Sequence, residues 1–172
     1  MRNTVIAKLK QYDACKEAVA WVRAQPNKQA AWDSCERGDW MLWYCARVSG
    51  GPASHSRKRV ILAACDCASL SLKFAGKHRK VVMKCIRTAR AWAHGQASMD
   101  QVRSAANAAN AAYTAYAARA AAYTAYAAYT ANAVYAANVA ASAAYTAAVS
   151  SKKCAQIVRE HYPKPPILRG KK

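Results

Sequence analysis

Residues 104–149 read SAANAANAAYTAYAARAAAYTAYAAYTANAVYAANVAASAAYTAAV. Of these 46 positions 25 are alanine, and neither glycine nor proline occurs among them. Alanine loses no side-chain entropy in a helix and is the best helix former, so this tract predicts one very long helix. At 1.5 Å per residue it would extend roughly 70 Å if unbroken. A bend or a hairpin near Asn132 or Asn138 remains open.

The rest of the 172-residue chain also has a helical pattern. Glycine and proline interrupt it near residues 26, 38, 50–52, 76 and 95, and from Pro163 onward. Between these breaks apolar residues recur at helical intervals, and no segment alternates with period two. We therefore predict an all-α fold: a compact helical bundle with one very long alanine- and tyrosine-rich helix. Residues 1–162 form a single helical domain, and residues 163–172 form a basic C-terminal tail.

Composition excludes several classes of protein. Hydrophobic residues make up 54% of the chain and charged residues 20%, which argues against disorder. No uninterrupted apolar run of 18 residues and no secretory signal occur, so we expect a cytoplasmic protein without a membrane partner. Seven cysteines, an odd number, indicate reduced and mostly buried thiols. Because only Cys65 and Cys67 are closely spaced, we expect no metal site and no cofactor.

The net charge of +19 points to an anionic partner. The excess is local, since residues 51–103 carry 11 basic and 2 acidic side chains. Within this block four cations follow one another at helical spacing, and we call them the basic stripe: Lys77, Lys80, Lys84 and Arg87. Arg90 lies close to them in sequence. Because no acidic residue is interspersed, anion binding is favoured over a merely solvated face.

The tyrosines of the alanine-rich tract also share a face. Tyr113, Tyr116 and Tyr123 fall in one sector of a helix, and Arg119 is the single charged residue of the tract. These rings either fill gaps between neighbouring helices, which is the commoner arrangement, or line a groove.

Residues 31–43 are the segment richest in tryptophan, with three tryptophans among charged residues. Arg37, Trp40 and Trp43 could build either a corner of the core or a binding pocket. No nucleophile elbow, phosphate-binding glycine loop or metalloprotease helix occurs anywhere in the chain, so we expect no catalytic residues and no enzyme activity.

Residues 35–43, CERGDWMLW, resemble the hallmark of an alanine-rich family of bacterial and phage proteins that are usually labelled immunity proteins. Further similarity follows in residues 62–68, 89–92 and 154–159, with His161 and Pro163. The resemblance implies a non-enzymatic protein of biological conflict, which neutralises a toxin or a defence signal. It would act in the cytoplasm, and if a phage encodes it, in the cytoplasm of the host cell.

The leading hypothesis is sequestration of a small anionic ligand, such as a nucleotide immune signal. Phosphates would meet arginine and lysine, and a base would stack on tryptophan or tyrosine. The alternatives are a toxin-immunity protein that binds an acidic protein, and a nucleic-acid-binding protein driven by charge. Homo-oligomerisation stays open. The candidate ligand-binding residues form two pockets: Arg37, Trp40 and Trp43 in one, and Lys80, Lys84, Arg87, Arg90, Tyr113, Tyr116, Arg119 and Tyr123 in the other.

Overall fold

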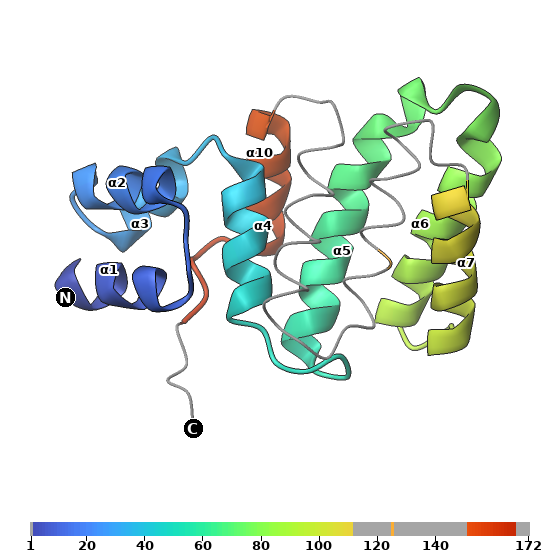
Figure 1. The fold of residues 1–172 in the computed structure, drawn as a ribbon, viewed down its shortest axis with the longest axis horizontal. Helices are drawn as coiled ribbons and strands as arrows, with labels where there is room; N and C mark the ends of the chain where they lie inside the picture. The colour runs from blue at the N-terminus through green and yellow to red at the C-terminus, as the bar shows by residue number, and fades with distance from the viewer. Residues whose placement is uncertain (1, 112–124, 126–150, 168–172) are drawn as a thin grey trace.

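The computed structural model describes residues 2–111, 125 and 151–167 (Figure 1). In this part of the chain the structure is all-α, with eight α-helices, two short 3-10 helices and no strands, which confirms the predicted fold class. The α-helices are α1 (Arg2–Gln11), α2 (Lys16–Ala24), α3 (Lys28–Ser34), α4 (Gly38–Arg47), α5 (His55–Ser69), α6 (Arg79–Ala93), α7 (Met99–Ala111) and α10 (Ser151–His161). The 3-10 helices Leu70–Phe74 and Gly76–His78 join α5 to α6.

Short polar residues begin several of these helices. The side chain of Asn27 accepts a hydrogen bond from the backbone N–H of Ala30 and caps α3, and Ser54 caps α5 in the same way through Arg57. Gly95, with φ of 78°, follows the end of α6 and turns the chain toward α7. The predicted breaks near residues 26, 50–52 and 95 are therefore confirmed.

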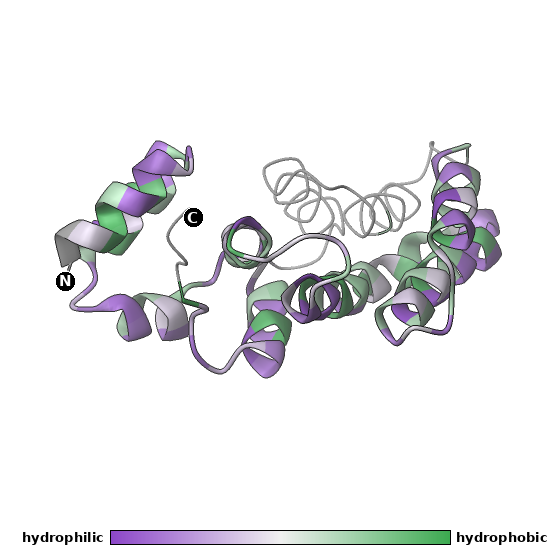
Figure 2. Ribbon diagram, turned by 90° about the horizontal axis from the view of Figure 1, so that it is seen from below, coloured by the Kyte–Doolittle hydropathy of each residue, from purple (hydrophilic) through white to green (hydrophobic). Residues whose placement is uncertain are grey.

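The helices stand side by side in a row (Figure 1). α4 packs on α5, α5 on α6, and α6 on α7, while the C-terminal α10 returns to pack on both α4 and α5. Helices α1–α3 lie at one end of the row and α7 at the other, which the second view also shows (Figure 2). Segments that are more than 100 residues apart in the sequence therefore meet at α4 and α10.

The core combines branched aliphatic residues with alanine and cysteine. Fully buried side chains include Leu42, Val60, Ile61, Val82, Val102 and Val158. Six of the seven cysteines are buried and Cys15 is exposed, so the prediction of buried cysteine packing is confirmed for six of them. Burial raises the pKa of the Cys85 thiol to about 12 and that of Cys45 further still, which keeps both thiols uncharged in the core.

The prediction of one very long helix is wrong. The longest helices in the described part of the chain, α5 and α6, contain 15 residues each. α7 carries the first part of the alanine-rich tract as far as Ala111, and the remainder of the tract, apart from Ala125, lies outside the described residues. Most helical stability in proteins comes from packing against partners, and partners of about 22 Å cannot cover a helix of about 70 Å.

The start of the predicted basic tail lies against the helices. The backbone carbonyl of Pro166 accepts hydrogen bonds from Lys28 Nζ and from the hydroxyl of Tyr44, each at 2.8 Å. The indole of Trp32 donates to the carbonyl of Tyr162 at 2.8 Å. Residues 162–167 thus connect α10 to α3 and α4. In residues 2–111 and 151–167, no helix combines the length and apolar character that crossing a bilayer requires.

Candidate functional site

The glycine of the CERGDWMLW segment lies where α4 meets α10. A Cβ atom added to Gly38 would overlap the Cβ of Cys154 and would approach the backbone N of Ala155 to 2.7 Å. The N–H of Gly38 donates to Ser151 Oγ at 3.0 Å. Gly38 is therefore needed for the close approach of two helices, rather than for a loop that holds a ligand.

Arg159 of α10 forms hydrogen bonds with the backbone at the start of the CERGDWMLW segment and just before it. Its Nη1 donates to the carbonyl of Cys35 at 2.7 Å and to the carbonyl of Trp32 at 3.2 Å. Glu36 forms an ion pair with Lys152, also on α10, at 2.6 Å. Residues 35–43 and 154–159, which carry much of the family resemblance, are thus the two sides of one structural interface.

Arg37, a predicted ligand-binding residue, already has internal partners. Its guanidinium donates two hydrogen bonds to the carboxylate of Asp39, at 2.9 and 2.6 Å, and lies 4.4 Å above the ring of Trp40. The hydrogen bond to Asp39 raises the pKa of Arg37. Because its charge is matched by a fixed carboxylate, Arg37 is a poor anchor for a phosphate.

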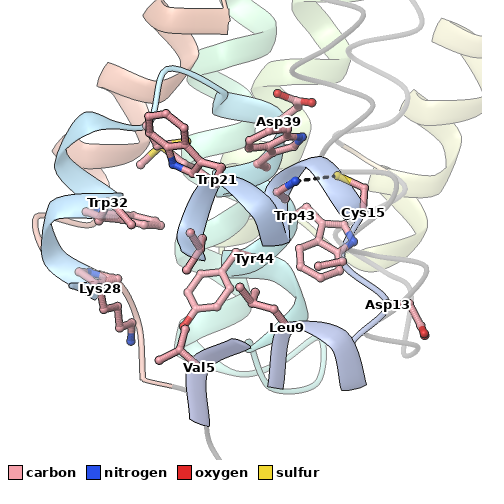
Figure 3. Close-up of a pocket in the computed structure, with 18 residues that line it drawn as sticks. Val5, Leu9, Asp13, Cys15, Trp21, Lys28, Trp32, Asp39, Trp43 and Tyr44 are labelled. Atoms are coloured by element: carbon pink, nitrogen blue, oxygen red, sulfur yellow. Dashed lines mark hydrogen bonds between the residues drawn. The ribbon is translucent and has the colours of Figure 1, made fainter. Parts of the chain in front are cut away.

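Next to this pair, Trp40 and Trp43 line a cavity of about 340 Å³, which we call the tryptophan cavity (Figure 3). Its walls come from α1–α4 and from Pro165 of the C-terminal segment, and they are mostly apolar. The charged residues in the lining are Asp13, Asp39 and Lys28, and Arg37 is not among them. Because Asp39 is paired with Arg37, an anionic ligand would meet the ammonium group of Lys28 and the exposed carboxylate of Asp13, which together do not favour it. Of the first predicted set, the structure brings Trp40 and Trp43 together at one cavity and leaves Arg37 out of its lining.

The basic stripe lies at the opposite end of the row, on α6 and the 3-10 turn before it. Lys77, Lys80, Lys84 and Arg87 are all exposed. None of these four side chains takes part in the ion pairs found among the described residues. Free like charges at helical spacing repel one another, so the stripe does not stabilise α6.

A second cavity, of about 490 Å³, lies between α6 and α7, which run side by side (Figure 1). We call it the α6–α7 cavity. Lys84 and Arg87 belong to its lining, together with the hydrogen-bonding side chains Thr88, Gln96, Gln101 and Ser104, and the lining contains no carboxylate. The sequence analysis missed these four polar residues. Their only sequence signal is that two amphipathic helices follow each other across a short turn at Gly95.

Arg90 does not belong with the free cations of the stripe. Its Nη2 forms an ion pair with Asp66 at 2.7 Å, and the second carboxylate oxygen of Asp66 lies 2.6 Å from His161 Nε2. This cluster joins α5, α6 and α10. Arg90 is thus a structural cation, which its position three residues after Arg87 does not reveal.

The remaining predicted residues of the second pocket, Tyr113, Tyr116, Arg119 and Tyr123, lie outside the described residues. Lys80 is exposed on α6 but is absent from the lining of the α6–α7 cavity. Of the predicted set, the structure thus brings together Lys84 and Arg87. Among the residues that the structure describes, no three His, Cys, Asp or Glu side chains cluster as metal ligands do.

The Asp66 cluster gives a pH-dependent prediction. Burial alone would raise the pKa of Asp66, but hydrogen bonds from His161 and Arg90 outweigh it, so the pKa lies below its ordinary value. A lowered carboxylate pKa in the folded state stabilises the fold above the unfolded-state pKa, about 3.9, and this contribution is lost as pH falls through the folded-state value. We expect Asp66→Asn to lower the Tm at pH 6, with the difference from the native chain shrinking below about pH 4.

Thermal melts followed by circular dichroism between pH 7 and pH 2.5 would check this. Asp33→Asn serves as a matched control because the Asp33 carboxylate is exposed and bonds only to the Gln29 amide among the described residues. A difference between Asp66→Asn and the native chain that stays constant over the whole range would contradict the prediction.

No protein family model, no curated protein and no solved structure matches this chain. The resemblance to alanine-rich immunity proteins therefore stays a prediction, and the function has to be argued from the geometry of the two cavities.

Proposed function

We propose that the protein binds a small phosphate-bearing ligand in the α6–α7 cavity and performs no chemistry on it. The observation that carries this proposal is the pairing of a cavity free of carboxylates with two exposed cations, Lys84 and Arg87, in its lining. Lys80 on α6 and Lys77 in the 3-10 turn before it extend the positive charge beyond the cavity.

Three properties of the lining support this ligand class. Arginine and lysine form short charge-assisted hydrogen bonds with phosphate oxygens, each worth about 1.5–3 kcal/mol. Gln96, Gln101, Thr88 and Ser104 can bond the polar edge of a base or the hydroxyls of a sugar. A cavity of about 490 Å³ lies within the size range of small-molecule sites, about 300–1000 Å³.

A purely binding role fits the absence of a suitable acid–base pair near this ligand. The lining contains neither histidine nor carboxylate that could move a proton at the phosphate. Asp66 and His161 form an acid–base pair, but both carboxylate oxygens of Asp66 are engaged, one by Arg90 and the other by His161. Sequestration of a nucleotide signal, the leading hypothesis of the sequence analysis, needs binding alone.

Isothermal titration with linear and cyclic mono- and dinucleotides tests the proposal. We expect at least one of them to give saturable heat with one site per chain. The affinity should fall only modestly between 50 and 200 mM salt, because few phosphates are contacted. Absence of heat from all of them with folded protein would refute it. Binding of long DNA or RNA alone, with an affinity loss of about 10³-fold or more over this salt range, would indicate charge-driven nucleic-acid binding instead.

A further inference from the structure

The tryptophan cavity has no part in the function proposed above, although its walls are unusually aromatic. Four of the five tryptophans of the chain line it: Trp21, Trp32, Trp40 and Trp43. Tyr44 adds a fifth aromatic ring, and Val5, Leu9, Val22 and Met41 complete most of the wall. Figure 3 shows the labelled members of this wall, among them Trp21, Trp32, Trp43 and Tyr44, arranged around one space.

The charged and polar groups of this wall are largely used within the protein. Lys28 Nζ and the Tyr44 hydroxyl both donate to the carbonyl of Pro166, and burial lowers the pKa of Lys28. The carboxylate of Asp39 accepts the two hydrogen bonds from Arg37. Asp13, which is exposed, has a negative charge that would repel an anion. Among the described residues a ligand would thus meet mainly apolar surface, and the one cation of the lining, Lys28, is already engaged by the Pro166 carbonyl.

One donor in the wall has no acceptor. Trp21 Nε1 is shielded from solvent and makes no hydrogen bond to the described residues. A buried donor without an acceptor costs stability. An unfilled apolar space likewise deprives its lining of dispersion contacts.

We infer that the tryptophan cavity is a second, separate ligand site that takes an uncharged aromatic molecule. The volume of about 340 Å³ lies at the lower end of the range for small-molecule sites, so the ligand has about two or three rings. Flat rings stack on tryptophan and tyrosine faces, which favours an aromatic ligand over an aliphatic chain. An anion is disfavoured because the exposed carboxylate of Asp13 would repel it and Lys28 Nζ is already bonded to the carbonyl of Pro166. An organic cation is disfavoured because the protein's own Arg37 and Lys28 already lie over the rings of Trp40 and Tyr44.

The fluorescent probe N-phenyl-1-naphthylamine, which is uncharged and has two aromatic groups, tests the site on the full chain. We expect saturable fluorescence enhancement with one site per chain. The 8-sulfonate of the same amine differs mainly by its negative charge, and we expect it to bind this cavity at least tenfold more weakly.

Two variants of α2 form a matched pair. Ala18 lines the cavity, whereas Ala20 is exposed on the same helix and is absent from the lining. Ala18→Trp should fill the space and weaken binding of the uncharged probe at least tenfold, while Ala20→Trp should change it less than twofold. Should Ala18→Trp fail to fold by circular dichroism, Val22→Phe adds less volume at the same wall and should weaken binding in the same direction.

Three results would overturn the inference: no saturable binding of the uncharged probe to the folded chain, equal weakening by Ala18→Trp and Ala20→Trp, or loss of its binding in the Lys84→Glu/Arg87→Glu variant. The last of these would place the probe in the α6–α7 cavity. Because the two cavities have no lining residue in common, failure of the nucleotide titrations would leave this inference intact, and the reverse also holds.

Discussion

Gly38→Ala should lower the free energy of unfolding by about 3 kcal/mol, because the added methyl group has no room between α4 and α10. It would overlap the Cβ of Cys154 and lie 2.7–2.8 Å from backbone atoms of Cys154 and Ala155. Backbone atoms in the middle of a packed helix cannot rotate aside as the end of a flexible side chain can. The helices must therefore move apart, which also strains the hydrogen bond from Gly38 N to Ser151 Oγ.

An opposing effect exists but is smaller. Alanine is a better helix former than glycine by up to about 1 kcal/mol, and Gly38 is the first residue of α4, where this gain is at its least. Steric overlap should therefore dominate. In a chain of this length 1 kcal/mol shifts Tm by about 2–4 °C, so we expect a fall of about 6–12 °C in thermal melts.

Gly51→Ala is the matched control for this experiment. A Cβ at Gly51 would meet nothing within 4 Å, so the same chemical change should alter stability by no more than about 0.5 kcal/mol. If the two variants melt at the same temperature as the native chain, α4 and α10 do not pack as closely as the structure has them.

Gly38 also shows what the sequence can and cannot predict. Glycine beside Asp39 reads as a chain break, and a helix does begin at that point. The reason for glycine, however, is a contact with Cys154, which lies 116 positions later. Patterns of short range reveal where helices begin and end, because caps and turns act locally. They do not reveal which helices touch, since that depends on partners far away in the chain.

The candidate site, too, could be predicted from the sequence only in part. The sequence predicts two pockets, one with tryptophan and one with lysine, arginine and tyrosine; the structure has one cavity lined by Trp40 and Trp43 and another lined by Lys84 and Arg87. It does not predict which cations are free. Arg37 and Arg90 resemble Arg87 in sequence, yet the first is held by Asp39 and the second by Asp66, 24 residues away. A local ion pair engages Arg37, and an ion pair between α5 and α6 engages Arg90, whereas Lys84 and Arg87 form none of the ion pairs among the described residues and line the cavity.

The alanine-rich tract misleads for a related reason. Intrinsic helix propensity is high over all of residues 104–149, so propensity alone sets no end to a helix there. The length of a helix in a folded protein is limited by the length of its neighbours, and the described neighbours have at most 15 residues. The limit on helix length therefore comes from the neighbouring helices of the folded protein, and the composition of the tract does not reveal it.

The double reversal Lys84→Glu/Arg87→Glu should weaken binding of a phosphate-bearing ligand by about 3–6 kcal/mol, at least a hundredfold, while leaving the fold intact. Two charge-assisted hydrogen bonds are lost, each worth about 1.5–3 kcal/mol, and the new carboxylates repel the phosphate. Both side chains are exposed and form none of the ion pairs among the described residues, so their loss should alter stability by about 0.5 kcal/mol at most. Removing repulsion with Lys80 can raise the Tm slightly.

Lys10→Glu/Lys16→Glu is the control that separates contact from overall charge. It changes the net charge by the same amount, from +19 to +15, but its exposed lysines lie on α1 and α2, away from the α6–α7 cavity. If Lys84 and Arg87 touch the ligand, titration calorimetry should give near-native affinity for this control and a loss only for the reversal at the cavity. Equal weakening of both variants would mean that the ligand responds to the field of the whole protein. A ligand whose affinity survives both the reversal and the control would have to bind outside the α6–α7 cavity, which would refute the proposed site.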